Sequence, residues 1–301
     1  MESSRLTVPA TDERMLRPGR GAKRFCGVTI SLMTVITIAA WQGQGNLDDV
    51  EANFAALDSA ASRAAEHDAQ ILVTPEMILS GYNIPRSDLM AQSHIDFADR
   101  VAQVATRYGI TILAGVPEFV HDGGSESRTA CYNTSLLVSS TGEPLLQYRK
   151  HQLFGELDRG LFTAGPTPVG VTEHLGITIG TMICYDVEFA ESVREARRRE
   201  VDLLLVPTAQ MEGYDIVNDA VIRTRAWDNG MYVAYVNRVG SESDLTYIGQ
   251  SSICSPSGQR IAGMASSNTE DLLFAQIDTA EVDAARALNP YLEDLRTDWR
   301  S

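Results

Sequence analysis

The chain has 301 residues, of which 44% are hydrophobic and 22% charged, an ordinary globular composition that excludes a disordered chain. Its 40 acidic residues outnumber its 25 basic residues and give a net charge of −15, so the basic surface that nucleic-acid binding needs is not expected. No stretch reaches the roughly 20 apolar residues of a membrane span. We therefore expect a cytoplasmic protein without a nucleic-acid or membrane partner.

Residues 1–32 differ in composition from the rest. They are rich in Arg, and an apolar run follows from Phe25 to Trp41. A basic start followed by an apolar run also occurs in signal peptides. We favour a first β-strand over 35–40, because its residues are largely β-branched. On this interpretation residues 1–32 are an extension, expected to be flexible, and residues 33–301 form one domain.

Strands and helices alternate along the rest of the chain. Apolar and β-branched runs predict strands over 35–40, 71–73, 110–116, 133–139, 144–148, 177–183, 201–206, 231–236, 251–254, 260–264 and 271–277. Helical spacing predicts helices over 46–67, 87–107, 188–199, 214–229 and 280–288. This alternation is typical of an α/β protein with buried sheets.

Several common kinds of site are missing from the sequence. It has no GxxxxGK[ST] phosphate loop, no CxxC pair and no GxSxG esterase motif. Its five His never stand two or four residues apart, as paired metal ligands on one strand or helix would. We therefore expect neither a metal nor a cofactor.

Three short segments carry candidate chemistry, and the first holds Glu76. The predicted strand 71–73 ends and a carboxylate follows, in Thr74-Pro75-Glu76-Met77. In α/β proteins, ligands bind at the carboxyl edge of the sheet. The alternative is that Glu76 only supports the start of a helix after Pro75.

The second segment, Tyr148-Arg149-Lys150-His151, holds one of only two lysines in the chain. Apart from Lys23 and Lys150, every basic residue is Arg. Because nearly every other basic residue is Arg, the presence of Lys150 indicates a position where a compact ammonium is needed and a planar guanidinium does not serve. The alternative is a lysine kept by chance in a solvated loop.

In the third segment, the predicted strand 177–183 runs into Cys184-Tyr185-Asp186, with a helix expected soon after. Such a turn exposes the sulfur, and the helix N–H groups would lower the pKa of the thiol and offer an oxyanion hole. The alternative is a buried structural cysteine, which we expect for the other three cysteines.

Glu76, Lys150 and Cys184 make a coherent catalytic set. Glu76 takes the thiol proton, Cys184 attacks a carbonyl carbon, and Lys150 with the backbone N–H of Tyr185 holds the oxyanion. Glu76 then protonates the departing ammonia and activates the water that hydrolyses the thioester. The expected reactants are a small amide and water.

These three residues, with their contexts TPEMILSGYN, YRKHQLFGELDRGLFTAG and GTMICYDVEF, resemble the nitrilase superfamily of carbon–nitrogen hydrolases, its amidase branch above all. The resemblance spans about residues 34–288. It implies a four-layer-forming αββα sandwich, paired into a homodimer or higher homo-oligomer. It also implies a second glutamate after the lysine, which maps onto Glu156 and would position Lys150 and the substrate. The alternative for Glu156 is a surface acid paired with Arg159.

The segment after the cysteine bears on the substrate. Nitrilases of the superfamily typically have Trp-Glu there, whereas this chain has Tyr185-Asp186, which favours amides. N-carbamoyl hydrolases often carry basic residues there, whereas Asp186 and Glu188 would repel an anionic substrate. We therefore predict a small neutral carboxamide, with Tyr82, Tyr185 and Gln210 in the pocket, unless the two tyrosines are core residues. The alternatives are a nitrilase or N-carbamoyl amide hydrolase and, from other classes, an acyltransferase or a non-catalytic scaffold.

Overall fold

The computed structural model describes residues 23–25, 28–30, 33–47, 49–121, 129–263 and 266–296. The chain divides into a first unit, 1–33, and a second, 34–301. The described part of the first unit includes an antiparallel hairpin of β1 (Lys23–Phe25) and β2 (Val28–Ile30). Most of the predicted extension, including Cys26, lies outside the described residues.

The second unit is built on two six-stranded sheets. The first has the order β16 (Asp271–Asp278), β3 (Val35–Gln42), β4 (Ile71–Val73), β5 (Thr111–His121), β6 (Thr129–Val138) and β7 (Pro144–Arg149). The second has the order β15 (Arg260–Ala262), β14 (Ser252–Cys254), β11 (Tyr232–Val236), β10 (Leu203–Pro207), β9 (Ile177–Thr181) and β8 (Gly170–His174). In each sheet three neighbouring strands run parallel, β3–β4–β5 and β9–β10–β11, and the flanking strands pair antiparallel.

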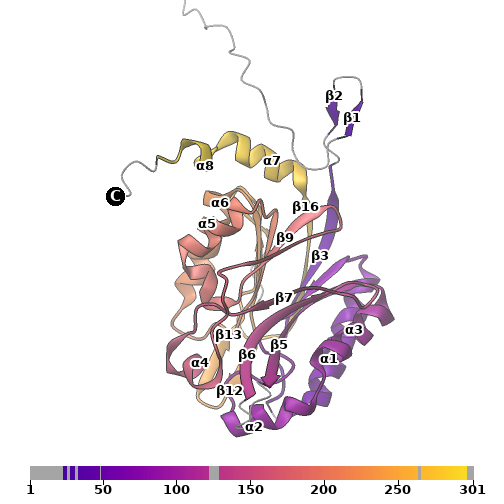
Figure 1. Ribbon diagram of the computed structural model, residues 1–301, viewed down its shortest axis with the longest axis vertical. Helices are drawn as coiled ribbons and strands as arrows, with labels where there is room; N and C mark the ends of the chain where they lie inside the picture. Colours follow the sequence, from indigo (N-terminus) through magenta and orange to yellow (C-terminus); the bar gives the residue numbers. More distant parts are fainter. Residues whose placement is uncertain are drawn as a thin grey trace, which may run out of the picture. The chain divides into compact units, whose positions relative to one another are not determined.

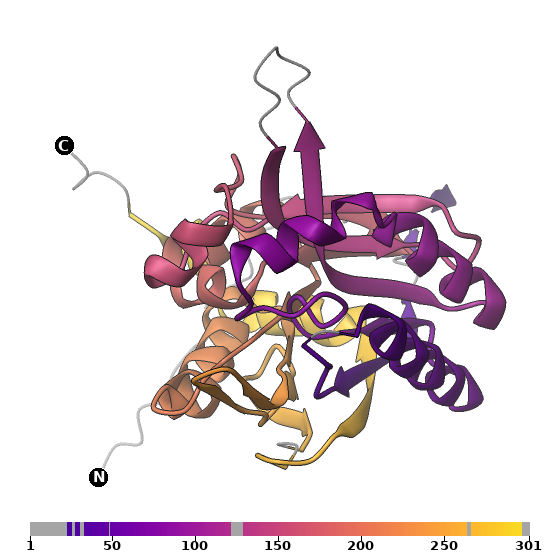
Figure 2. The same cartoon turned by 90° about the horizontal axis from the view of Figure 1, so that it is seen from below.

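Helices cover the outer face of each sheet. On one side lie α1 (Val50–Glu66) and α3 (Phe97–Tyr108), and on the other α5 (Ala190–Arg198) and α6 (Ile222–Asn229) (Figures 1 and 2). The last helices are α7 (Thr279–Leu288) and the short α8 (Tyr291–Asp294). The predicted αββα sandwich is confirmed.

The alternation of side chains along each strand builds these layers. On β10, Leu203 and Leu205 face the core between the sheets, whereas Leu204 and Val206 face the helices. On β3, Ile38 likewise faces the other sheet. Strands with both faces buried explain the near-continuous apolar runs of the sequence.

Some predicted elements differ at their ends or break. The helix expected over 87–107 is interrupted: α2 (Arg86–Ala91) and a 3₁₀ turn (Gln92–His94) precede α3. The cause is Asp96, whose side chain caps α3 by accepting the N–H of Asp99 at 2.9 Å. The helix expected over 214–229 becomes a π turn (Val217–Val221) followed by α6, and β8 was not predicted.

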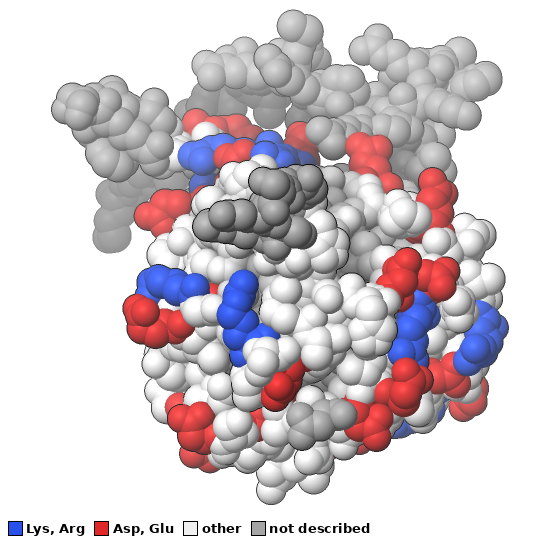
Figure 3. All heavy atoms as spheres, turned by 60° about the horizontal axis from the view of Figure 1, so that its bottom comes forward, with Lys and Arg blue, Asp and Glu red and all other residues white. Residues whose placement is uncertain are grey.

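The carboxyl ends of the parallel strands lie at the lower end of the view in Figure 1, together with α2, α4 (Gly155–Leu161) and the hairpin of β12 (Val239–Glu242) and β13 (Leu245–Ile248). On the face drawn in Figure 3, Lys and Arg side chains are scattered and most lie beside Asp or Glu, so no basic patch forms there. Within the described ranges, no helix has the length and apolar character needed to cross a membrane.

Candidate active site

Glu76 follows β4 and is completely buried. Its segment lies so close to β5 that a Cβ on Gly115 would approach the carbonyl oxygen of Pro75 to 2.3 Å, and only glycine fits there. The Oε1 atom of Glu76 accepts hydrogen bonds from Asn133 Nδ2 at 2.6 Å and from Lys150 Nζ at 2.8 Å. Its Oε2 atom has no hydrogen-bond partner within the described part of the chain. One carboxylate oxygen is therefore held and the other is free.

Lys150 follows β7 and is also completely buried. Its ammonium lies between two carboxylates, 2.8 Å from Glu76 Oε1 and 2.7 Å from Asp158 Oδ2. Burial opposes the charge, but Asp158 and Glu76 outweigh it and hold the pKa of Lys150 well above its ordinary value. For the carboxyl group of Glu76, burial raises the pKa, and the positive charge of the nearby Lys150 opposes that rise. A buried cation thus serves two buried carboxylates.

Cys184 stands at the end of β9, where the chain turns into a 3₁₀ helix (Cys184–Glu188). Its φ of 46° is in the left-handed region, which a non-glycine residue adopts only at some cost. The expectation of a lowered thiol pKa is wrong. Burial, and after it the negative charge of Glu76, raises the pKa of Cys184 well above its usual range, and Lys150 opposes this only in part. A thiol whose pKa is raised in this way would need a base to act as a nucleophile.

The turn at Cys184 is fixed by the buried carboxylate of Asp186. Its Oδ2 accepts from the backbone N–H of Ile183 at 3.1 Å and from the hydroxyl of Tyr148 at 2.8 Å, and its Oδ1 accepts from the N–H of Gln152 at 2.7 Å. Burial raises the pKa of Asp186 to about 6. Asp186 therefore ties the cysteine turn to the segment that carries Lys150.

Glu156 does not join this group, which corrects the sequence prediction. Its side chain is 95% exposed and pairs with Arg159 at 3.4 Å, the alternative that its sequence context left open. The carboxylate that holds Lys150 is Asp158, which is buried on the inner face of α4 with Leu161, one turn further on. Glu156 and Arg159 lie on the outer face, so helical spacing was the signal that distinguishes the two acids.

The predicted pocket residues Tyr82, Tyr185 and Gln210 lie together with Cys184 around one pocket. The hydroxyl of Tyr82 donates to Asp158 Oδ1 at 2.7 Å, and its ring lies 5.6 Å from Lys150 Nζ. Gln210 Oε1 lies 3.7 Å from the sulfur of Cys184. The rest of the lining consists of Phe154, Glu188, Met211 and Tyr214. Cys131 and Cys254 are buried away from this pocket, as expected.

The comparison with known families agrees with this geometry. The carbon-nitrogen hydrolase family matches residues 37–287. The chain belongs to the carbon-nitrogen hydrolase family.

Among the relatives of this carbon-nitrogen hydrolase is a protein of Pseudomonas protegens described as "hydrolase in pqqF 5′region". It is 39% identical, and the match covers 91% of this chain and 94% of the relative. The 2-oxoglutaramate amidase of Bacillus subtilis is 27% identical over 76% of this chain and 86% of its own. Both relatives are thus described as hydrolases, the second of them as an amidase.

An amidase from Nesterenkonia sp. AN1, of the nitrilase superfamily, is similar in structure. It has a TM-score of 0.75 and 31% identity, and the match covers 88% of this chain and 98% of that one. Mutants of that amidase have been solved with butyramide bound and with acrylamide added to the active-site cysteine. This carbon-nitrogen hydrolase thus resembles an amidase whose cysteine is chemically reactive.

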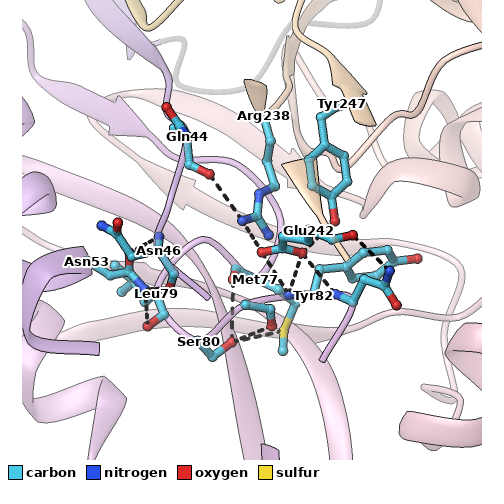
Figure 4. Close-up of polar contacts among 12 residues, drawn as sticks. Gln44, Asn46, Asn53, Met77, Leu79, Ser80, Tyr82, Arg238, Glu242 and Tyr247 are labelled. Carbon is cyan, nitrogen blue, oxygen red and sulfur yellow. Dashed lines mark hydrogen bonds and ion pairs between the residues drawn. The ribbon is translucent and has the colours of Figure 1, made fainter. Parts of the chain in front are cut away.

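A second buried network, which no sequence motif indicated, supports the loop after Glu76. Figure 4 shows Arg238, Glu242 and Tyr247 pointing toward one another. The carboxylate of Glu242 pairs with Arg238, accepts the hydroxyl of Tyr247 at 2.6 Å, and accepts the backbone N–H groups of Tyr82 at 3.1 Å and Asn83 at 2.9 Å. The network fixes the backbone of Tyr82, and through the Tyr82 hydroxyl it reaches Asp158.

Asn133 is the other contributor that the sequence did not single out. The side-chain Nδ2 of Asn133 donates to Glu76, and its backbone carbonyl oxygen accepts the backbone N–H of Lys150 at 2.8 Å. It thereby links the segments that carry Glu76 and Lys150. No group of three or more His, Cys, Asp or Glu in the described ranges is arranged to hold a metal ion.

Proposed function

We propose that this protein is an amidase that hydrolyses small neutral carboxamides to a carboxylic acid and ammonia through a thioester on Cys184. The proposal rests mainly on the different bonding of the two carboxylate oxygens of Glu76. Its Oε1 atom accepts a hydrogen bond from Lys150, while its buried Oε2 atom has no protein partner in the described ranges. A free carboxylate oxygen whose pKa is raised by burial is suited to accept and return a proton.

In the first half of the reaction, Glu76 takes the proton of the Cys184 thiol, and the sulfur attacks the amide carbon. The tetrahedral oxyanion is stabilised by the ammonium of Lys150 and the backbone N–H of Tyr185. Donors of this kind typically contribute a factor of about 10²–10³ to the rate. Glu76 then gives its proton to the nitrogen, the C–N bond breaks, and ammonia leaves the thioester behind.

In the second half, water enters where ammonia left. Glu76 takes a proton from this water, the resulting hydroxide attacks the thioester carbon, and the C–S bond breaks. The sulfur recovers the proton from Glu76, and the carboxylic acid is released. No metal or cofactor takes part in any step.

The charge of the pocket lining supports a substrate without negative charge. Glu188 lines the pocket and would repel a carboxylate, whereas Asp186 is buried behind the turn and has its own donors. The argument from charge therefore rests on Glu188 alone.

The test is ammonia release from a panel of simple amides, nitriles and N-carbamoyl amino acids, with Cys184→Ala as the control. We expect release from short neutral amides by the wild type and none by the variant. Release that is unchanged in Cys184→Ala, or no release from any amide, would refute the proposal. An acyltransferase would form a hydroxamate when hydroxylamine is added but would release little acid without such an acceptor.

A further inference from the structure

Glu188 is the only residue with a charged side chain among the described residues that line the pocket at Cys184. It stands at the end of the 3₁₀ helix that Cys184 begins, and its negative charge acts on the thiol. The mechanism proposed above has no use for a second carboxylate at this place. Its presence in an otherwise aromatic and neutral lining therefore needs a separate explanation.

The carboxylate of Glu188 has no hydrogen bond or ion pair with another group in the part of the chain that the structure describes. Two nearby cations, Lys150 and Arg225, act on this carboxylate through their charge, but their hydrogen bonds and ion pairs go to other groups. Lys150 pairs with Glu76 and Asp158, and Arg225 donates to the backbone carbonyls of Val187 at 3.0 Å and Glu188 at 2.5 Å. Arg225 thus holds the backbone of the turn and leaves the Glu188 side chain without a direct partner. A half-buried charge in this state gains free energy when a cation binds beside it.

Aromatic rings form much of the remaining wall. The ring of Phe154 meets those of Tyr185 and Tyr214 edge to face, with centroids 5.3 Å and 5.7 Å apart. All three line the same pocket as Glu188. Edge-to-face packing fixes the rings, and the electron-rich faces of aromatic rings attract ammonium groups. A carboxylate beside such rings is the usual chemistry of an alkylammonium site.

We propose that this pocket selects carboxamides that also carry a protonated amine, with the amide carbon at Cys184 and the ammonium between Glu188 and the aromatic rings. This inference rests on the proposed amidase function and extends it. On this proposal neutral carboxamides are still substrates, and an amide of the same size with an ammonium at its far end binds more tightly. Glu188 is then a specificity residue that contacts the substrate away from the bond that breaks.

The test compares 3-aminopropanamide with butanamide, which differ only in a terminal ammonium in place of a methyl group. Each is measured for kcat/KM of ammonia release at pH 7. We expect the wild type to favour the amine by about tenfold, the size of one desolvated cation contact, and Glu188→Gln to abolish this preference mainly through KM. Glu191→Gln removes the same charge from an exposed position nearby and should leave the ratio as in the wild type.

Binding of the same two amides to Cys184→Ala, measured by calorimetry with and without Glu188→Gln, reads the preference without turnover. Equal affinities for the two amides, or a preference that survives Glu188→Gln, would overturn the inference even if both amides are hydrolysed. If the amine binds more tightly and the preference is lost in Glu188→Gln, the site is established even where no amide is turned over. Absence of ammonia release counts against the amidase function alone.

Discussion

Replacing Asp158 by Asn removes one of the two carboxylates that hold Lys150. Asp158 accepts three hydrogen bonds, from Lys150 at 2.7 Å, from the hydroxyl of Tyr82 at 2.7 Å and from the N–H of Phe154 at 2.8 Å. Removing one partner of a buried ion pair typically costs about 3–5 kcal/mol. Because Glu76 still neutralises Lys150, we expect the lower end, about 3 kcal/mol, and a fall in Tm of about 6–12 °C.

The same substitution should also change the chemistry. Lys150 is left with Glu76 as its one carboxylate partner and moves toward it, away from the position of the oxyanion, so kcat should fall by about 10²–10³. The negative charge of Asp158 contributes to the raised pKa of Glu76. Its loss should therefore shift the acidic limb of the pH profile of kcat/KM to lower pH, a change that a purely structural role would not produce.

Glu156→Gln is the matched control for this experiment. It removes a negative charge from the same helix, but from a side chain that is 95% exposed. We expect Tm and kcat to stay within experimental error of the wild type, since exposed ion pairs contribute about 0–1 kcal/mol. If Glu156→Gln lost activity and Asp158→Asn kept it, the assignment of the positioning carboxylate to Asp158 would be refuted.

Three further substitutions test other parts of the site. Lys150→Arg should lose nearly all ammonia release, because a guanidinium cannot replace the ammonium between two carboxylates. Circular dichroism should show that the fold is retained, and normal activity would exclude the oxyanion role. Glu242→Gln should lower Tm and, by loosening the Tyr82 loop, lower kcat as well; a stable variant with wild-type kcat would show that the network does not support the site. For Asp186, whose pKa burial raises to about 6, the native state binds more protons than the unfolded state between about pH 4 and pH 6. The free energy of unfolding should therefore fall as the pH rises across this range, by about 3 kcal/mol more in the wild type than in Asp186→Asn. Urea unfolding measures this free energy, and parallel plots of it against pH for the two proteins would contradict the prediction.

Most strands and the α/β class could be predicted from the sequence because both faces of the central strands are buried, whereas the αββα layers were implied by the resemblance to the nitrilase superfamily and the order of the strands was not predicted. A run such as Leu203–Val206 has few interpretations other than a strand inside a sandwich. The break in the segment 87–107 was missed because it depends on a cap at Asp96 that overrides the apolar spacing on either side. The β12–β13 hairpin was missed because its strands are short and partly polar.

The residues of the candidate site also fall into two groups, those that the sequence indicated and those that it did not. The sequence indicated Glu76, Lys150 and Cys184 through their places after strands and through the scarcity of lysine, and the structure brings the first two into direct contact. Residues that act by supporting others left no such signal. Glu242 reaches Tyr82 across about 160 residues of chain, and no local pattern records a contact of that kind.

The raised pKa of Cys184 changes how the catalytic set should be understood. A thiolate poised by a helix would need no base, but this thiol and Glu76 are both buried, and burial raises the pKa of each. A proton that passes from sulfur to carboxylate moves the negative charge from one buried site to another, so the charge stays in a buried environment throughout. Lys150 is bound to Glu76 and also acts on Cys184, so it stabilises the charge before and after the transfer. Burial therefore disfavours a free thiolate, which would react with other electrophiles, while Lys150 offsets part of the cost of the proton transfer in the proposed reaction.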